Sequence, residues 1–482
     1  MVKFNKDKYL KKLRFKKYKR YLYIGIPCIL VLLIGIYFAY SKFSVFKEEE
    51  VVRTTVGDFI SGDAVIGAYI DGEYSKSIPG KNDGYIVDKI VCDNDASASW
   101  DNNSWGIVLT NLTKRTKCNV YFVVKPVPVV EKVTMAMNNN PSMFATDDPD
   151  NNIRYIGANP NNYVYFNCSD YDNQTADTCE LWRIIGVFNN VTKSNGKKEN
   201  LVKIIRADSL GDYSWDYKKS GVGTSTNDYG SNDWTDSQLM MMLNPTNYLK
   251  SGYTNSSDII SLGSQQLYSK MGSYYNGTKG CRPKYIVSGA SFSCTEVDFT
   301  STGLKNDTTR NVIEEVVWNL GGTGESYTSA SNGLASHFYG YERGTTVYMG
   351  RPTTWTGKIG LMYPSDYGYA TSGGTTKDRA ACLAKELYNW NNSSDFSDCK
   401  ENDYLLDTND LQWTLAPYSD DAYGAFVVFA AGFAYRTGVY TGREVHPSLY
   451  LKSYTEVKAG TGEKNNPYQY QLFSGVHQME LE

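Results

Sequence analysis

Residues 181–188 read LWRIIGVF, and residues 201–206 read LVKIIR. Both runs are short, apolar and rich in β-branched or aromatic residues, which is typical of strands buried in a sheet. Further strands are predicted at residues 163–166, 358–363, 425–429 and 445–451.

Helices are predicted at three places between these strands. Residues 235–238 (TDSQ) form a capping box, and apolar residues then repeat at helical spacing up to Leu243. A second apolar stripe follows residues 312–320, and a third helix is predicted at residues 379–388. Strands with a few inserted helices predict an α+β fold with long loops, at residues 208–232, 322–350 and 363–376.

The segment before this domain has a different pattern. Short alternating apolar runs in residues 51–124 predict a small all-β sandwich in which Cys92 and Cys118 tie two strands together. The two prolines of residues 125–134 favour extended backbone and predict a stiff linker. The α+β domain is then expected at residues 135–475.

The charge of the chain is uneven along its 482 residues. Residues 1–20 hold ten Lys or Arg and one acid, which leaves 39 basic and 51 acidic residues for the rest, a net charge of −12. A mildly acidic body of this kind is a poor partner for nucleic acid.

Residues 21–40 contain twenty residues without a charge, enough to span a bilayer of about 30 Å as a helix. The positive-inside rule then predicts a single-pass plasma-membrane protein with a lipid bilayer as partner, residues 1–20 as a cytoplasmic tail and the body extracellular. A cleaved signal peptide is the alternative, but the apolar run is longer than usual and lacks small residues at the cleavage spacing.

Cysteine usage agrees with an oxidising location. Apart from Cys28, which we interpret as a buried thiol, eight cysteines form four neighbouring couples. Sequential pairing predicts disulfides within each couple, namely Cys92 with Cys118, Cys168 with Cys179, Cys281 with Cys294 and Cys382 with Cys399. A zinc site would instead need clustered Cys or His spacing, which the chain lacks.

Motifs for phosphate binding, zinc proteolysis and the nucleophile elbow are absent from the sequence. His446 is most simply a structural residue of a strand, whereas His337 on a loop is the better candidate for a catalytic base. Residues 148–152 (DPDNN) begin like a calcium loop but lack its glycine and bidentate glutamate, so a polar turn is favoured. Neither a metal nor a cofactor is predicted, although Asp420 with Asp421 and Asn402 with Asp403 could supply oxygen ligands to a cation.

Forty tyrosines, many on loops beside Asn, Ser and Gly, are the most unusual feature of the composition. Such loops give rigid amphipathic surfaces for recognition, and aromatic faces suit sugars. Compositional drift from AT-rich codons explains the same abundance equally well.

The C-terminal order of motifs resembles bacterial extracytoplasmic domains with the C-type lectin or formylglycine-generating-enzyme fold. Domains of that group end with the pattern WxLxSP … GVRPxLxL. A similar order occurs here in residues 413–417 (WTLAP), 422–429, 432–442 and 445–452 (VHPSLYLK). The opening strands of that group look like residues 162–167 and 181–186. Its first helix is similar to the segment with Trp234, Leu239 and Leu243. The resemblance covers residues 152–470. His446 replaces the usual Arg, Ala416 replaces a common Ser, and neither the paired catalytic cysteines nor the Glu-Pro-Asn sugar signature is present.

The resemblance implies a scaffold for ligand-contacting loops. A membrane-anchored cell-surface binding protein or adhesin for a glycan or protein is expected, with Tyr435, Arg436, Tyr440 and Arg443 as ligand-binding candidates. No catalytic residue is assigned. Two alternatives stay open, a cell-wall hydrolase or transferase that uses Asp403, Asp420, Asp421 and Glu444, and a non-catalytic structural subunit.

Overall fold

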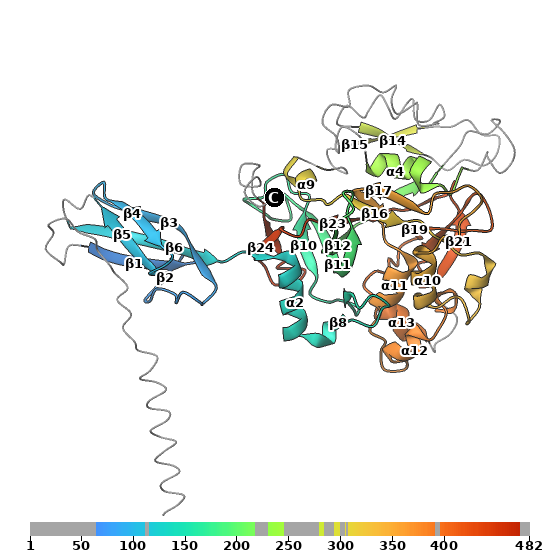
Figure 1. The fold of residues 1–482 in the computed structure, drawn as a ribbon, viewed down its shortest axis with the longest axis horizontal. Helices are drawn as coiled ribbons and strands as arrows, with labels where there is room; N and C mark the ends of the chain where they lie inside the picture. The colour runs from blue at the N-terminus through green and yellow to red at the C-terminus, as the bar shows by residue number, and fades with distance from the viewer. Residues whose placement is uncertain are drawn as a thin grey trace, which may run out of the picture. The chain divides into compact units, whose positions relative to one another are not determined.

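The computed structural model describes residues 64–110, 115–216, 230–244, 279–283, 294–298, 304, 307–390 and 396–472 (Figure 1). The chain divides into two compact units, Met1–Lys125 and Pro126–Glu482. The predicted tail and membrane span, residues 1–40, lie outside the described residues. In the part that is described, no helix combines the length and the apolar character needed to cross a bilayer. On this finding the expected single-pass plasma-membrane location is withdrawn.

The first unit is built from strands. A four-stranded sheet has the order β2-β1-β6-β3, and a hairpin of β4 and β5 accompanies it. Strand β1 pairs in parallel with β6, while β3 pairs with β6 in the antiparallel direction. The buried core gathers around Ile107, Leu109, Val120 and Phe122. The strands are β1 (Ala64–Ile70), β2 (Glu73–Ser75), β3 (Tyr85–Cys92), β4 (Ser97–Asp101), β5 (Gly106–Thr110) and β6 (Thr116–Val124).

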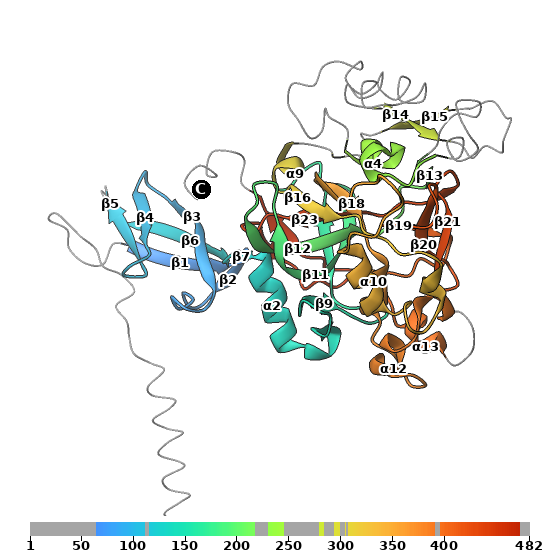
Figure 2. The same ribbon diagram turned by 45° about the vertical axis from the view of Figure 1, so that its right-hand side comes forward.

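The centre of the second unit is a seven-stranded sheet of order β18-β23-β12-β11-β9-β8, in which β10 also pairs with β11 (Figure 2). Gly186 is required where β11 meets β9, because a Cβ atom there would lie 2.1 Å from the carbonyl oxygen of Ile153. The strands are β8 (Phe144–Ala145), β9 (Ile153–Tyr155), β10 (Tyr163–Phe166), β11 (Glu180–Thr192), β12 (Lys198–Arg206), β18 (Ile359–Leu361) and β23 (Pro447–Leu451).

A second sheet of five strands has the order β13-β22-β19-β20-β21. Its members are β13 (Asp212–Ser214), β19 (Gln412–Pro417), β20 (Gly424–Val428), β21 (Ala434–Gly438) and β22 (Gly442–Glu444). Smaller sheets are β25-β24-β7, β16-β17 and β14-β15. Their strands are β7 (Val127–Pro128), β14 (Lys279–Pro283), β15 (Cys294–Asp298), β16 (Val316–Asn319), β17 (Thr354–Gly357), β24 (Glu456–Ala459) and β25 (Gln469–Gln471).

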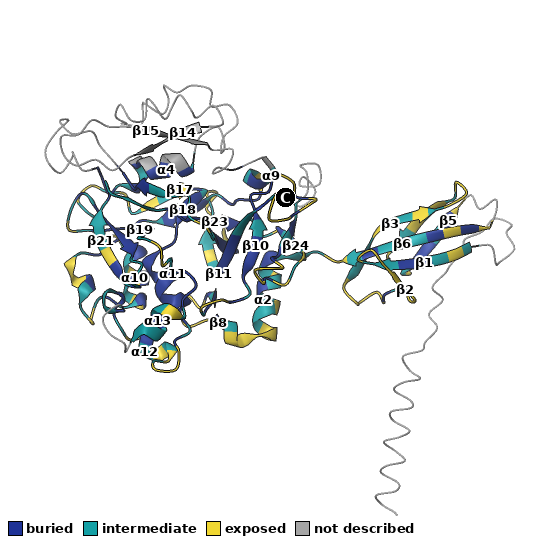
Figure 3. Cartoon of the chain, turned by 180° about the vertical axis from the view of Figure 1, so that it is seen from behind, coloured by how far each residue is buried: buried dark blue, intermediate teal, exposed yellow. Residues whose placement is uncertain are grey.

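The described helices are short and cover the sheets. They are α2 (Val129–Asn139), α4 (Gln238–Leu243), α9 (Asp307–Asn311), α10 (Ala335–Glu342), α11 (Pro364–Ala370), α12 (Arg379–Leu383) and α13 (Ser397–Glu401). Single turns of 3-10 helix lie at Pro141–Met143, Trp234–Asp236, Glu325–Thr328 and Leu387–Asn389. Helix α11 is buried at all seven residues, and Figure 3 shows it among the buried strands of this unit.

The predicted fold class is wrong. Strands account for 39% and helices for 17% of the structure, which is more β-rich than an α+β lectin-like domain. The stripe at residues 312–320 explains part of the error, because Val316–Asn319 is strand β16, paired with β17. Its two valines and Trp318 favour a pleated surface, and a spacing of four in a short apolar run does not separate helix from strand. The third predicted helix is also shorter, since α12 ends at Leu383.

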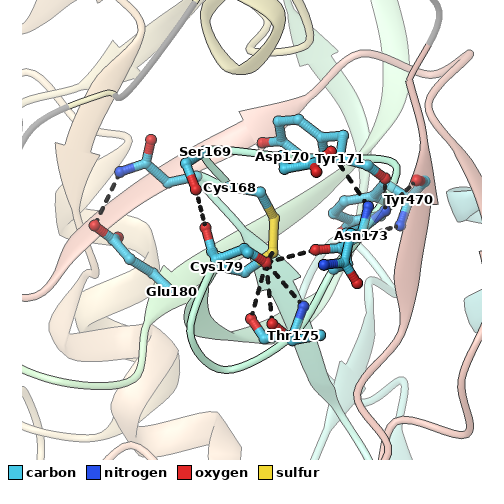
Figure 4. The surroundings of a disulfide bond; sticks show 12 residues. Cys168, Ser169, Asp170, Tyr171, Asn173, Thr175, Cys179, Glu180 and Tyr470 are labelled. Atoms are coloured by element: carbon cyan, nitrogen blue, oxygen red, sulfur yellow. Dashed lines mark hydrogen bonds between the residues drawn. A yellow bond between two sulfur atoms is a disulfide. The ribbon is translucent and has the colours of Figure 1, made fainter.

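Three disulfides join Cys92 with Cys118, Cys168 with Cys179, and Cys382 with Cys399. Figure 4 shows the second of them in a loop whose threonines hydrogen-bond to one another. Cys281 and Cys294 lie in the paired strands β14 and β15, but their side chains are outside the described part.

Candidate functional site

A cavity of about 130 Å³ opens in the second unit beside the central sheet. Its lining comes from segments far apart in the sequence: the turn before β9, the end of β11, strand β16, helix α10 and strand β23. The lining residues are Asp150, Asn152, Phe188, Asn189, Asn190, Val191, Thr192, Val317, Trp318, Asn319, Tyr339, Arg343, Tyr363 and Tyr450. We call this cavity the aromatic pocket.

Four of its aromatic rings surround the ammonium group of Lys203 on β12. The Nζ atom lies 4.5 Å from the ring centroid of Tyr363, 5.2 Å from Trp318, 5.6 Å from Phe188 and 5.7 Å from Tyr450. Lys203 is itself fully buried. The same rings therefore line the pocket and hold a buried cation by cation–π attraction.

The charge of Lys203 is balanced by Asp366 on α11, whose Oδ2 lies 2.6 Å from Nζ. Arg154 binds the other oxygen of Asp366 at 2.9 Å and Asp148 at 2.5 Å. Burial opposes ionisation of Asp366, but Lys203 and Arg154 outweigh it and lower its pKa to about 2. Burial lowers the pKa of Lys203 against the pull of Asp366. We call Arg154, Asp148, Lys203 and Asp366 the buried ion network.

Glu342 lies next to this network at the end of α10. Its carboxylate accepts hydrogen bonds from the backbone N–H of Ser365, at 2.9 Å, and from the Ser365 hydroxyl. Burial raises the pKa of Glu342 to about 7, although Arg343 and Ser365 oppose the shift. This carboxyl group is consequently poised to titrate near neutral pH.

Hydrogen bonds fix one side of the pocket rim. The Tyr339 hydroxyl donates to Asp150 Oδ2 at 2.5 Å and accepts from Asn152 Nδ2 at 3.0 Å. The guanidinium of Arg343 stacks 3.3 Å from the centroid of the Tyr339 ring. Asn152 also accepts from the backbone N–H of Asn189 at 2.7 Å. This side of the rim is rigid before any ligand arrives.

Other polar groups of the rim make no hydrogen bond to the described residues. They are the side-chain amides of Asn190 and Asn319 and the hydroxyls of Thr192 and Tyr450. All four are neutral groups that can donate or accept. The pocket thus combines aromatic surface with neutral hydrogen-bonding groups.

The predicted ligand-binding residues lie elsewhere. Tyr435 and Arg436 are on β21, Tyr440 lies between β21 and β22, and Arg443 is on β22. Arg436 forms an ion pair with Asp421, and Tyr435 is 38% exposed. None of the four lines the aromatic pocket.

The acids considered for hydrolysis have separate partners. Asp420 accepts a hydrogen bond from the backbone N–H of Glu325, whereas Asp421 pairs with Arg436. Asp403 is 4% exposed, and burial raises its pKa well above the ordinary range. Glu444 lies beside His446 instead.

The Asp148 turn and His337 also have structural partners. Asp148 accepts hydrogen bonds from Asn152 and Arg154, so its oxygens serve the fold. Nδ1 of His337 accepts from the backbone N–H of Leu334 at 3.4 Å, at the start of α10.

The aromatic pocket was not predicted from the sequence. One signal was present, because Lys203 interrupts the apolar run LVKIIR at a position between two residues of a buried strand. A lysine there must be paired or functional.

Comparison with known proteins gives no further identification, since no family model, no curated protein and no solved structure matches the chain.

Proposed function

We propose that the unit Pro126–Glu482 is a non-catalytic binding module for a neutral, hydroxyl-rich ligand, such as one sugar residue of a glycan. The observation that carries this proposal is the composition of the aromatic pocket. Phe188, Trp318, Tyr339, Tyr363 and Tyr450 form the aromatic part of the lining, each at most 7% exposed, and the free amides and hydroxyls of the rim supply neutral hydrogen bonds. Aromatic faces stack on the C–H groups of a sugar ring while amides bind its hydroxyls.

The size of the pocket limits what can enter. Pockets for drug-sized molecules have volumes of about 300–1,000 Å³, and this one has about 130 Å³. A single ring at the end of a longer ligand therefore suits it better than a nucleotide or a whole cofactor.

The charge of the lining favours a neutral ligand. Asp150 is the one acid among the described lining residues, and its Oδ2 lies 3.8 Å from Nε of Arg343. Hydrolysis of the glycosidase type requires two carboxyl groups in one cleft. The lining thus favours binding over the hydrolase alternative, and a structural subunit would need no such pocket.

A glycan array probed with the full-length chain tests this proposal directly. Saturable binding to a set of glycans with a common terminal sugar is expected. Absence of binding to any glycan, together with hydrolysis of none, would favour the structural alternative, and release of sugar from an array ligand would favour the hydrolase.

A further inference from the structure

Three ligand atoms, from His446, Asp407 and Glu444, come together at the end of strand β22 in the second sheet. Their nitrogen and oxygen atoms all lie within 4.8 Å of one another. Nε2 of His446 is 3.2 Å from Oδ2 of Asp407 and 3.6 Å from Oε2 of Glu444. This cluster shares no residue with the aromatic pocket.

The local backbone explains the convergence. Glu444 ends β22 and is held there by its backbone N–H, which donates to the carbonyl oxygen of Leu411 at 2.8 Å. His446 follows two residues later in extended chain, so both side chains point to the same side while the buried Val445 points to the other. Asp407 arrives from the loop before β19, where its Oδ1 accepts from the backbone N–H of Asn409 at 2.8 Å.

The imidazole of His446 is oriented from behind. Its Nδ1 lies 3.1 Å from the carbonyl oxygen of Arg206, which can accept only a donated N–H. This bond leaves Nε2 facing the two carboxylates. Arg206 is itself fixed, because its guanidinium pairs with Glu180 at 3.0 Å and donates to the carbonyl oxygens of Asp208 and Ser209.

Two of the three ligand atoms make no hydrogen bond of good geometry, although ion-pair attraction holds the cluster together. Among the described residues, Nε2 of His446 and Oε2 of Glu444 are buried with no hydrogen-bond partner, despite their short separations from other polar atoms. His446 itself is only 4% exposed. Buried polar atoms without partners are rare, and a shared cation is a direct explanation.

We propose that His446, Asp407 and Glu444 bind one Zn²⁺ ion. Nitrogen and oxygen ligands of a tetrahedral zinc ion lie about 3.3–3.6 Å from one another, given metal–ligand distances of about 2.0–2.2 Å. The separation of 3.6 Å between Nε2 and Glu444 falls within this range, and the separation of 3.2 Å between Nε2 and Asp407 lies just below it. The imidazole nitrogen favours zinc over calcium or magnesium, which take oxygen ligands in larger numbers. Three protein ligands leave the fourth position for water.

Access to the cluster is open at the carboxylate side. The side chains of Asp407 and Glu444 are 16% and 18% exposed, so an ion can enter from solvent. The competitor for Nε2 is a proton. Burial lowers the pKa of His446, but the two carboxylates outweigh it and raise the pKa to about 9. A protonated imidazole between two carboxylates is therefore the alternative state of this cluster.

The test uses the full-length chain after removal of metals with a chelator. Calorimetric titration with ZnCl₂ is expected to give one ion per chain, and Co²⁺ is expected to give the visible absorption of a tetrahedral complex. Asp407→Asn and Glu444→Gln are each expected to weaken zinc binding by about tenfold or more. Asp410→Asn and Glu401→Gln, which change neighbouring or exposed acids, are expected to leave it unchanged.

X-ray absorption of the unsubstituted zinc complex provides a measurement that does not depend on the folding of variants. A spectrum with imidazole and carboxylate ligands supports the proposal, and a spectrum without imidazole overturns it. Failure of the unsubstituted chain to bind zinc saturably also overturns it, as does binding that both ligand substitutions leave unchanged. Either of these results means that the cluster is a structural ion triad.

Discussion

Lys203 and Asp366 form an ion pair of 2.6 Å with both side chains buried, and the lysine contacts four rings that line the aromatic pocket. Strand β12 supplies the cation and helix α11 supplies the anion, so the pair also joins two elements that are far apart in the sequence. Because the same four rings contact Lys203 and line the pocket, the position of the ion pair sets the position of the pocket walls.

Lys203→Met is expected to destabilise the second unit strongly. It leaves Asp366 buried with Arg154 as its remaining ion partner. Loss of one partner of a buried pair costs about 3–5 kcal/mol, because the other charge stays in a medium of low polarity. The free energy of unfolding, measured by urea denaturation of the full-length chain, checks this value.

Lys193→Met is the matched control. Lys193 forms ion pairs with Glu199 and Glu314, but its side chain is 16% exposed. Loss of a partly solvated pair costs about 1 kcal/mol or less. Equal losses in the two variants would show that Lys203 is not an essential partner of Asp366.

Glu342 is expected to make stability depend on pH. Its pKa rises from the ordinary value of 4.5 to about 7 in the folded chain because it is buried. The folded state therefore holds the proton more tightly than the unfolded state, so the stabilising effect is complete below about pH 4.5 and is lost as the pH rises through 7. Over this pH range the free energy of unfolding is expected to fall by up to about 3 kcal/mol.

Glu342→Gln removes this titration. We expect the difference in free energy of unfolding between the unsubstituted chain and this variant to decrease from pH 5 to pH 8. Glu401→Gln on the exposed surface of α13 provides the comparison. A difference that stays constant with pH would mean that Glu342 keeps an ordinary pKa.

Local composition was sufficient to predict many of the strands. Residues 163–166 coincide with β10, and LWRIIGVF and LVKIIR lie within β11 and β12. In these segments β-branched and aromatic residues agree with the buried environment that the fold provides. Residues 312–320 failed because their apolar spacing fits a helix while Val316, Val317 and Trp318 pack as a strand.

The site could not be predicted in the same way. The aromatic pocket brings together Asp150, Phe188, Asn319 and Tyr450, whose proximity depends on the order of strands in the sheet. Sequence spacing holds no information on that order. The cluster of His446 shows the same limit, since the pattern Glu-Val-His predicts two side chains on one face but cannot place Asp407 opposite them.

Two substitutions at the rim of the aromatic pocket are expected to weaken glycan binding. Tyr450→Phe removes a hydroxyl and Asn319→Ala removes an amide, and neither group has a partner among the described residues. A hydrogen bond to a ligand contributes about 0.5–1.5 kcal/mol, so affinity should fall by about twofold to tenfold for each. Calorimetry with the glycan that gives the strongest array signal measures the change.

Tyr435→Ala separates this pocket from the surface predicted on β21. Tyr435 is exposed and outside the pocket lining, so its substitution is expected to leave affinity unchanged. Loss of binding in Tyr435→Ala, with Tyr450→Phe and Asn319→Ala unaffected, would instead place the ligand on β21.

Removal of the Cys168–Cys179 disulfide is expected to lower the free energy of unfolding by less than the value calculated from loop closure. The bond closes a loop with a sequence separation of 11, which the chain-entropy model values at about 3 kcal/mol.

However, Gln174 within the loop donates to the carbonyl oxygen of Tyr470 at 2.7 Å and accepts from its backbone N–H at 2.9 Å. These bonds hold the loop to β25 without the disulfide, so replacement of both cysteines by serine should lower the free energy of unfolding by about 1–2 kcal/mol. Adding Gln174→Ala to the serine variant should cost more than Gln174→Ala alone does in the oxidised chain, because the two restraints then fail together. Additive losses in urea denaturation would show that the disulfide and Gln174 act independently.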